Sequence, residues 1–229
     1  MIRQTPRVPR RLGDFSGASF LHEVFLAELA YECAWFELAW DEMYKARDEG
    51  DARVLADPLR DNLKVWSYVD RMLTHIVRIN RLLNPDPRAG PKESEDSRRW
   101  RVEFAEWIGD RVLTDLALDP DSLQARNGSE HANEYLHDFI AKYGAPRGGR
   151  NPRFAKFSIG VMGDSGRPEG APIPIRSFNY TDGVCVVFGR PINLLRMCER
   201  VKGLRSQLPP APVATELWRG DRRLSGPPE

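Results

Sequence analysis

Residues 119–143, DPDSLQARNGSEHANEYLHDFIAKY, carry the clearest signals for both the fold and the chemistry of this chain. Asp119 and Pro120 form a typical helix start, because a short acidic side chain accepts hydrogen bonds from unpaired backbone N–H groups and proline suits the first helical position. Gly144 follows the stretch, and glycine commonly ends a helix. The stretch therefore predicts a helix that ends near residue 143.

A second helix start lies inside this stretch. Asn127 followed by Glu130 fits a capping box, in which two polar side chains bind backbone N–H groups of the first turn. A start there places Arg126 near His131, whereas an unbroken helix would place them about 140° apart around the axis. We favour a break near Gly128, because glycine inside a helix costs about 1 kcal/mol.

Three longer apolar patterns come before this stretch. They predict helices at about residues 18–48, 58–83 and 95–117, because apolar residues recur there every three or four positions. Asp57 and Pro58 repeat the helix-start signal. The first pattern is apolar over so broad a face that we expect burial against several helices or a second subunit.

The pattern changes after residue 143. Residues 144–153 are rich in glycine and arginine, and they precede apolar runs that predict strands at 154–162, 173–180 and 184–188. Helical spacing returns at 191–208. We therefore predict a mainly α protein, an up-and-down four-helix bundle with a small C-terminal β appendage and a terminal helix.

The domain boundaries follow from these patterns and from proline content. We predict a flexible basic arm at residues 1–15 and a helical-bundle domain at 16–145. We predict an appendage of a β-hairpin plus a helix at 150–208 and a disordered tail at 209–229.

Composition narrows the class of protein. Hydrophobic residues make up 41% and charged residues 29%, which is typical of a globular protein. No run approaches the roughly 20 apolar residues of a membrane span, and the N-terminal residues lack the apolar core of a secretory signal. We therefore expect no membrane partner and a cytoplasmic location.

Charge and cysteine usage add further limits. The net charge is +1, but 28 of the 34 basic residues are arginine, which suits phosphate recognition and also follows from GC-rich codon usage. Cys33, Cys185 and Cys198 lack the spacing of a zinc site or of a disulfide framework. We expect no metal and no cofactor.

His75 is the one histidine in the predicted helix at 58–83. Arg71 and Arg78 lie four residues before it and three after it, which predicts a polar flank on this helix. No Asp, Glu or His lies three or four residues before or after His75 in the sequence, which argues against a role as a metal ligand.

The order Arg126-Asn127-x-x-x-His131, at the head of the last bundle helix, resembles the HEPN superfamily over about residues 18–143. That superfamily includes metal-independent ribonucleases of toxin–antitoxin, abortive-infection and CRISPR systems. The resemblance implies an endoribonuclease that acts on RNA as a homodimer, with two Arg–His sets meeting across the interface. It also implies an antitoxin or defence partner protein.

The residue chemistry is consistent with this function. RNA cleavage without metal needs a group that accepts or donates a proton, and histidine, with an unperturbed pKa near 6.5, suits that task. We expect His131 to serve as the acid or base, Arg126 to stabilise phosphoryl charge and Asn127 to orient His131. Further substrate contacts are expected from Glu130, Arg147, Arg150 and Arg153.

Other interpretations stay open. Arg126 can simply pair with Glu130 while Asn127 caps the helix and His131 is a partly buried polar residue. The alternatives to an enzyme are a non-catalytic module that binds a nucleotide, an RNA or a partner, and a helical dimerisation protein that recruits a partner by strand pairing.

Overall fold

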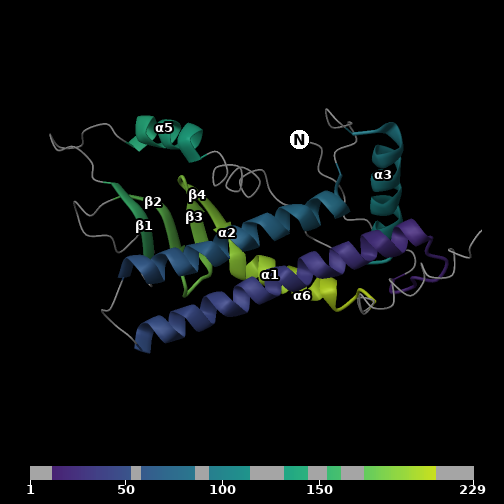
Figure 1. Cartoon of the computed structure of the whole chain (residues 1–229), viewed down its shortest axis with the longest axis horizontal. Helices are drawn as coiled ribbons and strands as arrows, with labels where there is room; N and C mark the ends of the chain where they lie inside the picture. The colour runs from purple at the N-terminus through teal and green to yellow at the C-terminus, as the bar shows by residue number, and fades with distance from the viewer. Residues whose placement is uncertain are drawn as a thin grey trace, which may run out of the picture.

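The computed structural model describes residues 12–52, 58–85, 93–113, 132–143, 154–160 and 173–209. Its helices are α1 (Phe20–Ala52), α2 (Pro58–Leu83), α3 (Glu95–Gly109), α5 (Ala132–Tyr143) and α6 (Leu194–Arg205). Its strands are β1 (Phe154–Gly160), β2 (Ile173–Asn179), β3 (Val184–Val187) and β4 (Arg190–Asn193). The expected class, a mainly helical protein with a small sheet, is confirmed (Figure 1).

The long helices α1 and α2 form the centre of the molecule, and α3 lies across one end of this pair (Figure 1). Every third or fourth residue on the inner faces is apolar, so each helix buries a continuous stripe. The largest fully buried side chains on the two helices are Leu29, Phe36, Met43, Trp66, Met72, Leu73, Ile76 and Ile79. This helical pair positions the candidate site described below.

The strands form one sheet in the order β1-β2-β3-β4. β1 pairs with β2 in parallel, whereas β2, β3 and β4 are joined by antiparallel pairs. Phe178, Cys185 and Ile192 face one another across three neighbouring strands, and each is at most 2% exposed. This cross-strand row buries one face of the sheet.

The sheet and α6 share one hydrophobic core with α1, α2 and α3. Leu194, Val201 and Leu204 of α6 join the same buried cluster as the inner faces of the long helices. Arg205 at the end of α6 forms an ion pair with Glu37 of α1. The C-terminal part that we expected as an appendage therefore packs directly on the helical pair.

The helix α5 lies beside the sheet (Figure 1). Its buried Phe139 contacts the turn between β3 and β4, where the rings of Phe139 and Phe188 meet edge to face at a centroid distance of 6.1 Å. Phe188 has a positive φ of 49°, an uncommon conformation for an aromatic residue. The arrangement of α5 as the closing helix of a four-helix bundle stays a prediction.

Three predicted boundaries inside the described ranges are wrong. The helix expected at 95–117 ends at Gly109, because Gly13 N–H binds the Arg111 carbonyl and the Gln207 amide binds both backbone groups of Leu113. These contacts replace the hydrogen bonds of a further helical turn. The helix expected at 191–208 begins only at Leu194.

The residues before Leu194 form the edge strand β4. Proline is compatible with an edge strand, where a missing N–H breaks few ladder bonds, so Pro191 does not prevent pairing. Asn193 then caps α6, since its side-chain oxygen accepts a hydrogen bond from Arg196 N–H at 2.7 Å. The helix α1 also runs past Gly50, because the cost of one glycine is small against the rest of a long helix.

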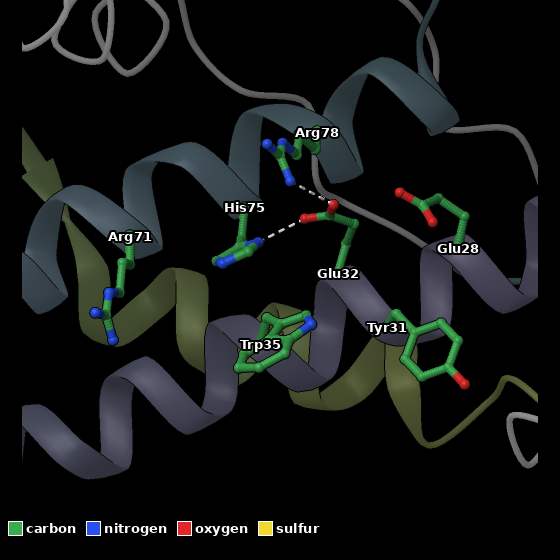
Figure 2. A pocket seen from close by; sticks show the side chains of 7 residues that line it. All are labelled: Glu28, Tyr31, Glu32, Trp35, Arg71, His75 and Arg78. Carbon is green, nitrogen blue, oxygen red and sulfur yellow. Dashed lines mark hydrogen bonds and ion pairs between the residues drawn. The ribbon is translucent and has the colours of Figure 1, made fainter. Parts of the chain in front are cut away.

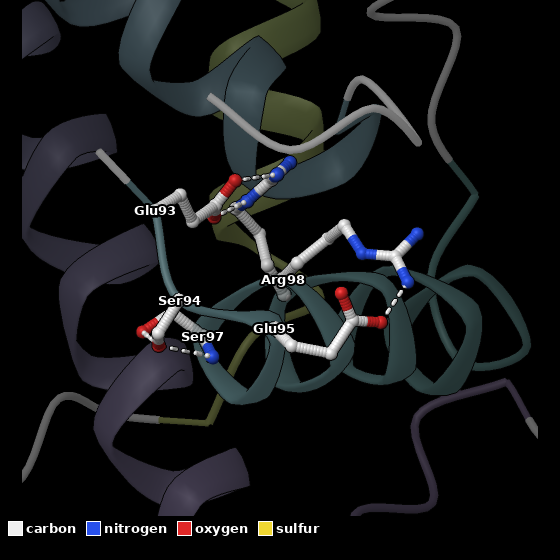
Figure 3. A network of polar contacts seen from close by, with 6 residues as sticks. Glu93, Ser94, Glu95, Ser97 and Arg98 are labelled. Carbon is white, nitrogen blue, oxygen red and sulfur yellow. Dashed lines mark hydrogen bonds and ion pairs between the residues drawn. The ribbon is translucent and has the colours of Figure 1, made fainter. Parts of the chain in front are cut away.

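The start of α3 is fixed by a local polar network (Figure 3). Ser94 caps the helix by accepting a hydrogen bond from Ser97 N–H at 3.1 Å. Arg98 pairs with Glu95 one turn away, and Arg101 donates two hydrogen bonds to Glu93 at 2.7 and 2.8 Å. Among the residues that the structure describes, no helix is long and apolar enough to cross a membrane.

Candidate functional site

The residues that the sequence singled out for catalysis, Arg126, Asn127 and His131, lie outside the described residues. The expected substrate contacts Glu130, Arg147, Arg150 and Arg153 lie outside them as well. The structure therefore neither brings these side chains together nor separates them. Their roles stay predictions.

The described residues contain a polar pocket between α1 and α2, which we call the α1–α2 pocket (Figure 2). It is open to solvent and has a volume of about 530 Å³. Its lining consists of Glu28, Tyr31, Glu32, Trp35, Arg71, His75 and Arg78. The first four come from α1 and the last three from α2, at helical spacings that place each group on one face.

Glu32 is the most buried polar residue of the α1–α2 pocket, with 4% exposure. Its Oε2 atom lies 2.6 Å from His75 Nδ1, and its Oε1 atom accepts a hydrogen bond from Arg78 Nη1 at 3.0 Å. Both carboxylate oxygens are thus bound by residues of α2. A buried carboxylate that is satisfied in this way holds its partners in fixed positions.

His75 is oriented by this carboxylate. An ionised carboxylate only accepts hydrogen bonds, so the short contact requires Nδ1 of His75 to carry the proton. Nε2 then has a free lone pair in the neutral ring. Figure 2 shows this nitrogen on the side of the ring away from Glu32, toward Arg71.

The aromatic side chains of the α1–α2 pocket have exposed surfaces. Trp35 is 54% exposed, and its ring lies nearly parallel to that of His75, with an angle of 11° and a centroid distance of 6.4 Å. Tyr31, one turn earlier on α1, is 39% exposed. Indole and phenol rings that are half accessible offer flat surfaces on which a planar ligand can stack.

Arg71 and Arg78 supply the positive charge of the α1–α2 pocket. Arg78 is 56% exposed even though it binds Glu32, so part of its guanidinium remains open to a ligand. Arg71 lies over the ring of Tyr68 at 5.5 Å, which holds it on the exposed face of α2. Two guanidinium groups beside an oriented imidazole form an arrangement that suits a phosphate group.

A second histidine lies in a different aromatic environment near the start of α1. His22 stacks on Trp107 at 4.4 Å, and Arg111 lies over Trp107 at 4.3 Å. His22 Nδ1 accepts a hydrogen bond from Ser19 N–H at 3.3 Å, and Nε2 is 4.0 Å from the exposed Glu103. Burial lowers the pKa of His22, with Glu103 raising it and Arg111 lowering it further.

The described side chains do not form a metal centre. Within the described ranges there is no group of three His, Cys, Asp or Glu residues placed to hold a metal ion. Burial raises the pKa of the Cys33 thiol to about 12 and that of Cys198 to about 11, so these thiols are poor ligands and poor nucleophiles. The chemistry of the α1–α2 pocket rests on an imidazole, carboxylates and guanidinium groups.

Sequence reasoning found three pocket residues, Arg71, His75 and Arg78, as a polar flank, but missed Glu32. A signal was present, because Glu32 is a single acid among the apolar positions Leu29 and Phe36 on the buried face of α1. A charged residue at a core position needs a partner. The spacing of residues within α1 does not show that this partner comes from α2.

Comparison with family models, with curated proteins and with solved structures finds no match for the chain.

Proposed function

We propose that this protein binds RNA in the α1–α2 pocket and cleaves it without a metal ion. The observation that carries the proposal is the 2.6 Å contact between the buried Glu32 and His75, which directs one imidazole nitrogen away from the carboxylate beside exposed arginines. A carboxylate that fixes the tautomer of a histidine is a common device of general acid–base catalysis.

The reaction that fits these groups is attack by the RNA 2′-hydroxyl on the adjacent phosphorus. His75 Nε2 accepts the hydroxyl proton as the new bond to phosphorus forms, and the protonated ring returns a proton to the departing 5′-oxygen. Arg71 and Arg78 stabilise the charge on the phosphoryl oxygens. The products carry a 2′,3′-cyclic phosphate and a 5′-hydroxyl.

Two histidines therefore compete for the role of acid and base. The geometry of the α1–α2 pocket supports His75 for this role, and the resemblance of the motif at residues 126–131 to HEPN ribonucleases supports His131. The homodimer, the antitoxin or defence partner and the cytoplasmic location that we expected from the sequence remain part of this proposal.

The test is RNA cleavage by the purified protein in EDTA, with analysis of the product ends. We expect His75→Ala to reduce the rate at least 10²-fold, because it removes the proton-transfer group. His22→Gln is the matched control and should cut RNA at the wild-type rate. If His75→Ala keeps full activity and His131→Ala loses it, the active centre is the motif at residues 126–131 and not the α1–α2 pocket.

The second candidate is a non-catalytic module that binds RNA or a nucleotide. The exposed indole of Trp35 favours it, because cleavage of a phosphodiester does not by itself require a stacking surface. A wild-type protein that binds RNA but leaves every tested RNA intact, with and without metal ions, would support this function and rule out the enzyme.

A further inference from the structure

Cations recur along the exposed face of α2 with the spacing of a heptad. Lys64, Arg71 and Arg78 are all exposed, and each lies seven residues from the next. Seven residues are close to two helical turns, so these side chains share one face and span about 21 Å along the axis. Arg71 and Arg78 line the α1–α2 pocket. We call this set the cation row.

Exposed apolar side chains recur along α1. They are Phe20 at 71%, Val24 at 42%, Tyr31 at 39%, Trp35 at 54% and Leu38 at 47% exposure. With 100° per residue, all of them fall within a narrow sector of the helix surface. We call this set the ring row after Tyr31 and Trp35, the members that line the α1–α2 pocket.

The cation row and the ring row lie beside each other. At the pocket, Trp35 stacks against His75, whose neighbours on α2 are Arg71 and Arg78. Further along, Lys64 lies close enough to Glu42 of α1 to help lower the pKa of that carboxyl, whose main cause is the hydrogen bond from Lys45. The cation row therefore lies near α1 at Lys64 as well as at the pocket, and we call the strip of surface from the pocket to Lys64 the inter-row strip.

The two sides of the inter-row strip differ in charge. The α2 side presents the cation row, whereas the α1 side has Glu28 and the buried Glu32 beside Tyr31 and Trp35, and Glu42 beyond Leu38. Phosphate groups are attracted to α2 and repelled from α1. A ligand with one charged edge and one flat apolar edge satisfies both sides.

We propose that the inter-row strip is a path for single-stranded RNA, with the phosphate backbone along the cation row and the bases on the ring row. The inference rests on the proposed function and adds that its substrate is single-stranded. A duplex does not fit, because its bases already stack on one another and cannot reach Trp35 and Tyr31. The path places His75 between backbone and bases, beside the sugar.

The test measures binding of a fluorescent 2′-O-methyl RNA of about 10 nucleotides, a length within known single-strand site sizes. This RNA cannot be cleaved by 2′-hydroxyl attack, so binding is measured independently of catalysis. The logarithm of the binding constant should fall with the logarithm of salt concentration with a slope of about −2 or steeper, from three phosphate contacts. Lys64→Ala and Arg71→Ala should each reduce the magnitude of that slope by about 0.7.

The variant Trp35→Leu separates stacking from charge. It should weaken binding about 10-fold while leaving the salt slope unchanged, because it removes a ring and no cation. The matched control is Arg99→Ala on α3, since Arg99 is 67% exposed and lies outside the rows. It should bind RNA as the wild type does.

Each outcome separates the path from the proposed function. Unchanged slopes in Lys64→Ala and Arg71→Ala would overturn the path, even if His75→Ala abolishes cleavage of natural RNA. Reduced slopes in a protein that cuts no RNA would support the path and overturn the enzyme. Light scattering provides a further outcome. If the protein has the mass of two chains, if Trp35→Leu abolishes this dimer and if RNA leaves it intact, the ring row is a dimer contact and the path is overturned.

Discussion

His22 and His75 have neighbours of the same kinds and very different surroundings. Each ring stacks on a tryptophan and lies near a glutamate and an arginine. The carboxylate beside His75 belongs to the buried Glu32 and lies 2.6 Å from Nδ1 of the ring. The carboxylate beside His22 belongs to Glu103, whose side chain is 62% exposed, and it lies 4.0 Å from Nε2 of the ring. The depth of the carboxylate, and not the choice of residues, distinguishes the two clusters.

This difference assigns different tasks to the two rings. His22 uses Nδ1 as an acceptor for the Ser19 N–H near the start of α1 and fills space beside Trp107, so it acts in capping and packing. His75 uses Nδ1 as a donor to Glu32 and leaves Nε2 for a ligand. Nδ1 is engaged in both rings, so the difference is that it accepts a hydrogen bond from the backbone in His22 and binds a buried carboxylate in His75.

The largest expected effect concerns the two tryptophans. Trp107 is partly buried among Phe15, His22 and Phe104, so Trp107→Ala should lower the free energy of unfolding by about 2 to 4 kcal/mol. Trp35→Ala should lower it by less than about 1 kcal/mol, because more than half of that side chain is already in water. Urea unfolding followed by circular dichroism measures both, and equal losses would remove the contrast between the clusters.

A smaller effect is expected from the two glutamates. Glu32→Ala should cost about 2 to 3 kcal/mol, because it removes two charge-assisted hydrogen bonds at a buried position. Glu103→Ala should change stability by less than about 0.5 kcal/mol, since that side chain is mostly exposed.

Glu32→Met sharpens the same comparison. An apolar side chain of similar volume should restore stability to within about 1 kcal/mol of the wild type. It should not restore RNA cleavage, because nothing then fixes the tautomer of His75. A stable and fully active Glu32→Met protein would show that the carboxylate has no part in the chemistry.

The smallest expected effect is a pH dependence from His22. Its pKa is lowered in the folded chain, chiefly by burial, so the unfolded chain binds a proton at a higher pH than the folded chain does. The contribution to stability is complete above the ordinary pKa near 6.5 and is lost as the pH falls below it.

The variants that test this effect change the slope in opposite directions. His22→Gln should flatten the loss of stability between pH 7 and pH 5, and Glu103→Gln should steepen it by removing the group that raises the pKa. Urea midpoints at several pH values provide the measurement. An unchanged slope in His22→Gln would mean that other groups set the acid sensitivity.

The parts of the fold that local sequence determines were predictable. α2 begins and ends as expected, because the sequence carries a helix-start signal just before it and its apolar spacing is regular to residue 83. The strands β2 and β3 were found from their apolar runs, whereas the four residues of β4 include a proline and a single large apolar side chain, Ile192. Their pairing with β3 is a tertiary effect that no local pattern signals.

The candidate site was predictable only in part, for a related reason. Arg71 and Arg78 flank His75 within one helix, so their spacing in the sequence reveals them. Glu32 lies 43 residues from His75, and only the packing of α1 on α2 brings the two together. Long-range contacts of this kind require the register between two helices, which periodicity does not supply.

The packing of α6 on α1 has a consequence for the order of synthesis. Arg205 and Glu37 are 168 residues apart, so α1 leaves the ribosome long before its partner exists. At about 5 to 20 residues per second, the apolar face of α1 waits on the order of 10 s for α6. Closing so long a loop also costs entropy before any contact repays it. The part of α1 near Cys33 and Glu37, which lies close to Arg205 in the folded chain, therefore lacks its α6 partner during translation, and a chaperone can protect it in this interval.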